Sequence, residues 1–250
     1  MSAKRIAALM VVAVLGTGMA MGQTVWVEDP ENPAIGPGDT GSWDVGGPWA
    51  RSVVFDGTTY HLYFTGSDSG GFPNDMGHAT SDDGEEWTMD PANPVLTRGE
   101  TGSWEATSLD GAAVIHDGTT FHMWYCAIDS GYVERVGYAT SADGTMWTKH
   151  AGNPIVDVGP SGSWDRQYIR PTTLMVEDGT YRMWYGGGHS TGNENWYAVG
   201  LAVSDNGLDW QKRPEPVLSP STFPGAWDPG MVANPYIVFR DSTYHMWYSG

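Results

Sequence analysis

The sequence has a single cysteine, Cys126, and few basic side chains. One cysteine excludes an internal disulfide, so stability has to come from packing, for which 13 tryptophans and 12 tyrosines are available. The run Met123–Cys126 predicts a buried thiol in the core rather than a nucleophile. The 12 lysines and arginines stand against 30 acidic residues, giving a formal charge of −18. A surface this acidic repels phosphate backbones and excludes nucleic acid as a partner, whereas it fits a neutral sugar, a cationic ligand or solubility alone.

The sequence also lacks long apolar runs, except for one at the N-terminus. Two basic residues precede an apolar segment at 6–21, which ends in small residues at Gly22. This order is typical of a signal peptide, so we expect residues 1–22 to be removed and the mature protein to be secreted, into the periplasm or to the extracellular surface. A permanent membrane helix would need about 20 apolar residues and a stop-transfer flank. No membrane association is therefore expected after cleavage.

The strongest pattern is an internal repeat, marked by a tryptophan that is followed five or six residues later by Asn-Pro or Glu-Pro. The tryptophans are spaced 61, 60 and 63 residues apart, at Trp26, Trp87, Trp147 and Trp210. The units start near residues 32, 93, 153 and 215. A period of this length indicates blades or a solenoid.

Each unit has the same internal order of features. A Gly/Pro-containing loop leads to a short apolar strand (52–55 in the first unit), an Asp-Gly turn, an aromatic strand (60–64), a third strand (77–80), a second turn and a fourth strand that opens with the repeat tryptophan. Asp-Gly between β-rich runs is a strong hairpin signal, so each unit is predicted to be a four-stranded antiparallel meander, as in a propeller blade. We find no helical periodicity. The predicted fold class is an all-β β-propeller.

The N-terminal segment predicts how the propeller closes. Residues 26–30 match 87–91 and thus represent a fourth strand that has no first three strands before it. Such a strand completes the last blade of a ring and removes two exposed edges. We therefore expect one propeller domain at 23–250, monomeric and five-bladed, with the sequence breaking off within the fourth repeat, roughly 70 to 80 residues short of a closed ring.

The repeated core apolar-Asp-Gly-x-Tyr-x-(Met/Leu)-(Trp/Tyr)-Tyr and the closing Tyr-Ala-Thr-Ser-x-Asp-Gly-x-x-Trp resemble the five-bladed propeller superfamily of arabinanases, levansucrases and invertases, glycoside hydrolase families 43, 32 and 68 and their relatives. The turn at 81–87 is also similar to the Asp-box of sialidases, in which the aspartate caps its own turn. The resemblance implies a secreted glycoside hydrolase that cleaves extracellular poly- or oligosaccharide by paired carboxylates in a pocket at the axis. A non-catalytic glycan-binding or adhesion module is the alternative.

The catalytic candidates are Asp44, Asp110 and Asp165. Asp44 and Asp165 each follow a loop tryptophan near the start of a first strand, while Asp110 matches the place where the resembled families keep an aspartate at the head of the second blade. An acid at the position of Asp44 also occurs in the other units, as Glu105, Asp165 and Asp228. Such an acid is better explained by a structural task that every blade shares, such as capping the loop turn.

The substrate-binding candidates lie where the units differ from one another. Seven residues before the turn aspartate the first unit has Trp49 and the fourth has Asn234, and Arg170 precedes the corresponding proline of the third. Arg170-Pro171 is similar to the Arg-Asp-Pro of invertases with the aspartate missing. Trp196 closes the longest insertion, 189–196, and could stack on a sugar or belong to a variable surface loop.

No cofactor is expected. Two acidic loops, at 68–75 and 129–134, could hold a structural Ca²⁺, although their spacing fits no EF-hand. The partner expected from these observations is carbohydrate.

Overall fold

The computed structural model describes residues 32–70, 73–190, 195–223 and 225–250, and there the chain forms strands and no helix. Accordingly, these residues contain no helix long and apolar enough to cross a membrane. The predicted signal peptide and the predicted N-terminal fourth strand lie outside the described residues.

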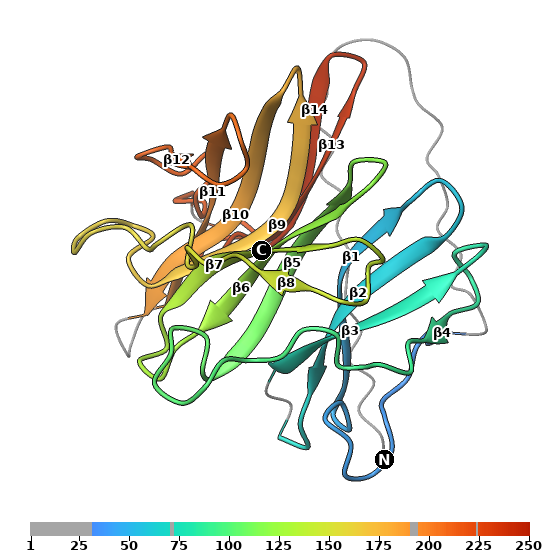
Figure 1. Ribbon diagram of the computed structural model, residues 1–250. Coiled ribbons are helices and arrows are strands. Elements are labelled where there is room, and N and C mark those ends of the chain that lie inside the picture. The colour runs from blue at the N-terminus through green and yellow to red at the C-terminus, as the bar shows by residue number, and fades with distance from the viewer. Residues whose placement is uncertain (1–31, 71–72, 191–194, 224) are drawn as a thin grey trace.

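The strands form four antiparallel sheets in chain order, coloured from blue to red in Figure 1. The first sheet contains β1 (Gly47–Phe55), β2 (Tyr60–Ser67), β3 (Pro73–Ser81) and β4 (Thr88–Met89). The second contains β5 (Ser108–His116), β6 (Phe121–Ile128), β7 (Glu134–Ser141) and β8 (Thr148–Lys149). The third contains β9 (Tyr168–Glu177), β10 (Thr180–Ser190), β11 (Asn195–Ser204) and β12 (Gln211–Lys212). The fourth contains β13 (Ala233–Arg240) and β14 (Thr243–Ser249).

Neighbouring sheets pack through their first strands. β1 contacts β5, β5 contacts β9, and β9 contacts β13, so the first strand of every sheet lies on the inside of the series. The predicted all-β propeller of four-stranded antiparallel blades is confirmed. The number of blades in the ring stays a prediction.

The strands begin earlier and run further than the sequence pattern predicted. β1 starts at Gly47, which pairs with Ser67, although the predicted strand began at residue 52. In the third blade, β10 and β11 continue their hairpin to the pair Ser190 and Asn195 and so include both ends of the predicted loop 189–196. Both segments lack an apolar run, so the sequence pattern did not predict them. Backbone pairing rather than side-chain burial extends these strands.

The repeat tryptophans pack between blades. The Trp147 ring, at the end of the second blade, meets the ring of Tyr63 edge-on at 5.5 Å, and Trp210 meets Trp124 in the same way at 6.3 Å. The turns before them have the expected cap, since Asp143 accepts hydrogen bonds from the backbone N–H groups of the two residues that follow Gly144. The structural role predicted for the Asp-box is confirmed.

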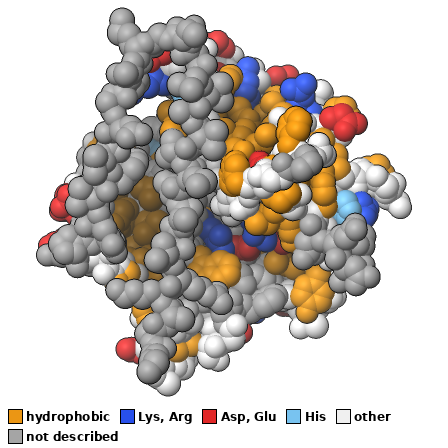
Figure 2. All heavy atoms as spheres, turned by 180° about the vertical axis from the view of Figure 1, so that it is seen from behind, with side chains coloured by type: hydrophobic (Ala, Val, Ile, Leu, Met, Phe, Trp, Pro, Cys, Tyr) orange, Lys and Arg blue, Asp and Glu red, His pale blue; other side chains and the backbone are white. Residues whose placement is uncertain are grey.

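The core lies within and between the blades, and the outer sheets leave apolar surface exposed. Cys126 is fully buried, as predicted. The first and fourth sheets each have a neighbour on one side only among the described sheets, and large hydrophobic side chains on them are exposed, including Val53, Phe55, Tyr236 and Phe239. Figure 2 shows hydrophobic side chains gathered over a broad area of one face.

Candidate active site

An irregularity in each of the four inner strands shapes the centre of the molecule. In β1, β5, β9 and β13 the pairing with the second strand of the blade shifts by a bulge. The residues left out of register are Arg51, Gly111, Thr172 and the pair Asn234–Pro235. Bulges bend a strand and re-aim its side chains, and they are frequent beside active sites.

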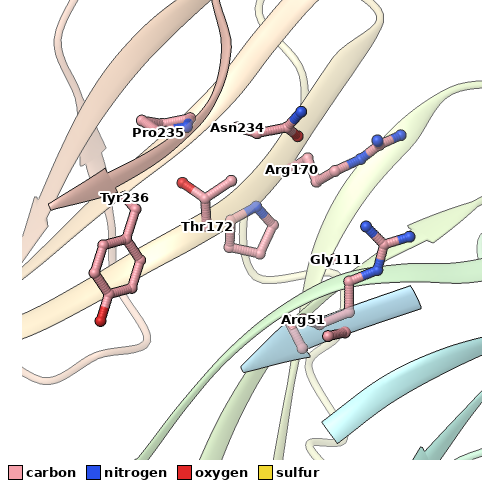
Figure 3. A pocket seen from close by; sticks show the side chains of 10 residues that line it. Arg51, Gly111, Arg170, Thr172, Asn234, Pro235 and Tyr236 are labelled. Carbon is pink, nitrogen blue, oxygen red and sulfur yellow. The ribbon is translucent and has the colours of Figure 1, made fainter. Parts of the chain in front are cut away.

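These residues line one cavity of about 190 Å³. Figure 3 shows Arg51 and Arg170 on one side of it and Tyr236 on the other. Asn234 has a positive φ of 50°, which an asparagine tolerates better than most residues. Each of the four sheets in the described part of the chain therefore contributes to a single cavity at the place where the sequence predicted a ligand pocket.

Behind the cavity wall lies a network of buried charges. Asp110 forms an ion pair with Arg51 through Oδ1 and with Arg170 Nη2 through Oδ2, the second at 3.1 Å. The same Arg170 nitrogen lies 2.7 Å from Oε1 of Glu134, at the start of β7. The two carboxylates therefore share one guanidinium nitrogen, which brings the two acids close together in the network.

The two arginines differ in their surroundings. Burial lowers the pKa of Arg170, but Glu134 and Asp110 outweigh it, and the net result is a pKa well above the ordinary value. The pKa of Arg51 is lowered, because its burial and the nearby Arg170 outweigh Asp110. Arginine keeps its charge in proteins, so two cations face two acidic groups in this network.

Cys126 belongs to the same network. Its Sγ donates to Oε2 of Glu134 at 3.6 Å. Burial, and then the charge of Glu134, raises the pKa of the Cys126 thiol well above its usual value. The group is therefore a neutral hydrogen-bond donor, whereas a nucleophilic cysteine needs a lowered pKa.

Three of the predicted site residues come together here. Asp110 contacts Arg170, and Arg170 lines the cavity with Asn234. Trp49 lies next to them, with the guanidinium carbon of Arg51 at 5.2 Å from its ring centre, and the tryptophan is 44% exposed.

Asp44 and Asp165 are placed differently, inside the loop of their own unit. Asp44 accepts a hydrogen bond from Ser42 Oγ at 2.6 Å. Asp165 contacts the hydroxyl of Tyr185 at 3.3 Å and Lys212 Nζ at 2.7 Å. Neither aspartate lines the cavity, and a catalytic role for them stays a prediction.

Trp196 also stands apart from the cavity lining. Its ring meets Trp164 edge-on at 6.0 Å and stacks on His189 at 5.9 Å. It lies in β11 as part of an aromatic group with Trp164 and His189, and the sugar-binding role stays a prediction.

Sequence reasoning missed Arg51, Glu134 and Tyr236. Arg51 and Tyr236 both lie five residues before the turn aspartate, where the second and third units have Ala112 and Thr173. The rule that selected Trp49 and Asn234, a position at which units differ, would have found them. Glu134 follows a loop of variable length and carries no such signal.

The predicted calcium loops hold ion pairs with arginine. Asp75 contacts Arg98 at 3.2 Å, and Asp129 contacts Arg135 at 2.7 Å. Within the described ranges, no group of three or more His, Cys, Asp or Glu side chains could hold a metal ion. A calcium site stays a prediction.

With this geometry established, comparison with known proteins identifies the family. Residues 51–228 match the N-terminal domain of glycosyl hydrolases family 32. The chain belongs to this family. The predicted resemblance to the propeller glycoside hydrolases is thereby confirmed.

Two relatives by sequence differ in how much of their length they share. An uncharacterised protein of Mycobacterium tuberculosis (strain CDC 1551 / Oshkosh) is 30% identical over 233 residues, which cover 88% of this chain and 73% of that protein. A 1,2-β-oligomannan phosphorylase of Thermoanaerobacter sp. (strain X514) is 29% identical over 142 residues, covering 52% of this chain and 47% of the phosphorylase.

Solved structures share the fold at low identity. A β-1,2-mannobiose phosphorylase from Listeria innocua has a TM-score of 0.66 and 16% identity, covering 88% of this chain and 59% of its own. A family 117 glycoside hydrolase from Zobellia galactanivorans has a TM-score of 0.61 and 18% identity, with coverages of 86% and 70%. At these identities the likeness shows the propeller fold alone.

Proposed function

We propose that this chain is an exported carbohydrate-active enzyme that breaks glycosidic bonds at the central cavity. The observation that carries the proposal is Asp110, an acid found at this position in one unit only and held by two arginines at the wall of a cavity to which four blades contribute. Membership of a glycosyl hydrolase family supports it.

The contacts suggest a role for each side chain. Both oxygens of Asp110 lie against guanidinium groups, which suits an anion acting as nucleophile or base rather than as proton donor. Glu134 supplies the second carboxyl group that glycoside hydrolysis requires. Tyr236, which is 62% exposed at the cavity, offers a ring face to a sugar, and the Asn234 amide offers hydrogen bonds to hydroxyl groups.

Phosphorolysis is a second candidate, favoured by the arginines that line the cavity. Arg51 and Arg170 carry the planar donor groups that bind phosphate. In phosphorolysis a phosphate oxygen, in place of water, forms the new bond to the anomeric carbon, and the leaving sugar takes the proton. A relative by sequence and a structural neighbour are named as phosphorylases of β-1,2-linked mannose sugars.

A glycan-binding module without catalysis is the third candidate. It is favoured by the contacts of Asp110 and Glu134, because both acids are buried and engaged by arginine. Such a module would bind sugar through Tyr236 and Trp49 without assembling a working acid pair.

One assay separates the three candidates. The full chain is incubated with arabinans, fructans, xylans, mannans and β-1,2-mannobiose, with and without inorganic phosphate, and reducing sugar and sugar phosphate are both measured. Release without phosphate indicates a hydrolase, and sugar phosphate formed only when phosphate is present indicates a phosphorylase. Binding of a glycan in calorimetry with no release in either arm indicates the binding module and refutes catalysis.

The variant Asp110→Asn assigns the site in that assay, and Asp165→Asn is its matched control. If Asp110→Asn no longer releases sugar and Asp165→Asn still does, the result supports a catalytic site at the central cavity. Export is tested separately, by expressing the chain in a bacterial host and determining the N-terminal residue of the mature protein by mass spectrometry. A mature protein that begins at Gln23 supports the proposal, and an intact Met1 in the cytoplasm refutes it.

A further inference from the structure

Four titratable side chains form a continuous row across the first blade, away from the central cavity. Nε2 of His61 lies 3.2 Å from Oδ2 of Asp56, and Nδ1 of His61 lies 3.0 Å from Nε2 of His78. Nδ1 of His78 lies 2.9 Å from Oδ2 of Asp90. Both imidazoles are buried, with side chains 8% and 2% exposed.

Counting protons shows that two neutral imidazoles cannot satisfy this row. Each of the three contacts needs one N–H hydrogen, because a nitrogen lone pair repels both a carboxylate and another lone pair. Two neutral imidazoles supply two such hydrogens. The third must come from an additional proton, which makes one ring of the pair an imidazolium.

The outer acids do not supply the missing hydrogen. Backbone N–H groups of Thr59 and Thr58 lower the pKa of Asp56. Burial raises the pKa of Asp90, but hydrogen bonds from His78, Ala92 and Thr145 outweigh it, and the net pKa is lowered. Both acids are therefore anions, and the proton has to lie on the imidazoles.

The groups around His61 and His78 favour one positive charge on the pair but disfavour a second. The tyrosine ring of Tyr63 stacks on His78, and the ring of Phe121 packs against His61. Burial lowers the pKa of His78, its contact with Asp90 opposes this, and neighbouring His61 lowers the pKa further, while Asp143 from the second blade raises it. The pair thus carries one additional proton, which we place on His61, with His78 neutral and accepting.

The second blade has an aspartate and a histidine at the first two positions of the row, but it has Tyr138 at the position of His78 and His150 at the position of Asp90. His122 replaces His61 and lies 3.0 Å from Asp117, but its other nitrogen lies 2.6 Å from the hydroxyl of Tyr138, at the position of His78. A tyrosine hydroxyl brings its own hydrogen and can donate to a neutral imidazole. The second blade therefore needs no additional proton.

We propose that His61 and His78 share one additional proton in the folded protein at neutral pH, and that its loss makes the first blade less stable as the pH rises. The folded chain then binds more protons than the unfolded chain above about pH 7, where free imidazoles are neutral. Stability falls with rising pH wherever the folded state binds more protons. Below about pH 6 stability instead increases with pH, because His78 stays neutral in the folded chain and takes a proton in the unfolded chain.

The experiment replaces His78 of the first blade by tyrosine, the residue that the second blade has at this position as Tyr138. Melting temperatures of the full chain, His78→Tyr and the control His150→Gln, which removes an exposed histidine, are measured from pH 6 to 9. Between pH 7 and 9 the melting temperatures of the wild type and the control should each fall by roughly 2 to 4 °C more than that of His78→Tyr. Parallel curves for all three proteins would overturn the proposal.

A second measurement needs no variant and covers the case in which His78→Tyr does not fold. The ¹⁵N shifts of the histidine rings of the wild type report which nitrogens carry hydrogen at pH 7. The expected result is both nitrogens of His61 protonated and only Nδ1 of His78 protonated. Two neutral rings at pH 7 would refute the shared proton.

Discussion

Two groups of buried carboxylates in this protein differ in what holds them. In the second and third blades, the acids that recur in every unit are held by a tyrosine and a lysine that recur with them. Glu105 contacts the hydroxyl of Tyr125 at 3.0 Å and Lys149 Nζ at 2.8 Å, and Asp165 has the equivalent tyrosine and lysine. The acids that occur once, Asp110 and Glu134, are held by arginines that reach across blades.

This difference separates fold from site. A contact that recurs from blade to blade serves each blade and its loop, whereas a contact that joins different blades at one place belongs to the single cavity that they share. The four predictions that follow test this division, from the largest expected effect to the smallest.

The largest effect is expected for Asp110→Asn. Replacing this carboxylate removes the anion that pairs with both arginines of the cavity, and glycoside cleavage should fall by a factor of about 10² to 10⁴. Asp165→Asn removes an equally buried acid from a blade and should leave the rate within a few-fold of the wild type. The reverse ranking in folded variants would mean that the repeated acids carry the chemistry.

Arg170→Met should be the most destabilising of the charge variants. It leaves both Asp110 and Glu134 without a main partner in a buried setting, which costs about 3 to 5 kcal/mol in the free energy of unfolding. Lys212→Met leaves Asp165 its tyrosine and serine contacts and should cost about 1 to 3 kcal/mol. Urea unfolding measures both, and equal losses would remove the distinction between the two groups.

Gly111→Ala compares a glycine of the site with a glycine of the repeat. Gly111 has φ of 47°, and an added Cβ would lie 2.5 Å from Cγ of Arg170, so the variant should lose about 1 to 3 kcal/mol and displace the arginine. Gly102 has φ of 90° with no atom within 4 Å of its Cβ position, so Gly102→Ala should show backbone strain alone. Substrate binding by calorimetry should weaken only in Gly111→Ala.

The smallest effect is expected for thiol reagents. Burial and Glu134 raise the pKa of the Cys126 thiol, so the native protein should not react with a disulfide reagent at any pH from 7 to 9. Reaction should become complete in denaturant. Rapid labelling of the native chain would show that the network around Glu134 is open to solvent.

The blades could be predicted because their signals are local. Each turn aspartate lies a few residues before its aromatic strand, each repeat tryptophan closes its own turn, and the pattern recurs from unit to unit. The start of β1 at Gly47 was missed because pairing with Ser67 extends the strand through residues that carry no hydrophobic pattern.

The site could be predicted only in part. Asp110, Arg170 and Asn234 were found because each differs from its counterparts in the other units. Their neighbour Glu134 was not found, since it reaches Arg170 from a different blade, 36 residues away in sequence.

The sequence by itself determined an all-β repeat, the order of strands in each blade, and the turns and tryptophans that shape and join the blades. These features follow from short-range backbone and side-chain preferences. Only the tertiary structure decided which acids meet which cations. Asp110 and Asp165 have the same side chain and nearly the same burial, but packing of the inner strands places one against Arg51 and Arg170 at the cavity and the other against Lys212 in its own blade. Proximity between blades depends on how the sheets stack, and no local pattern encodes it.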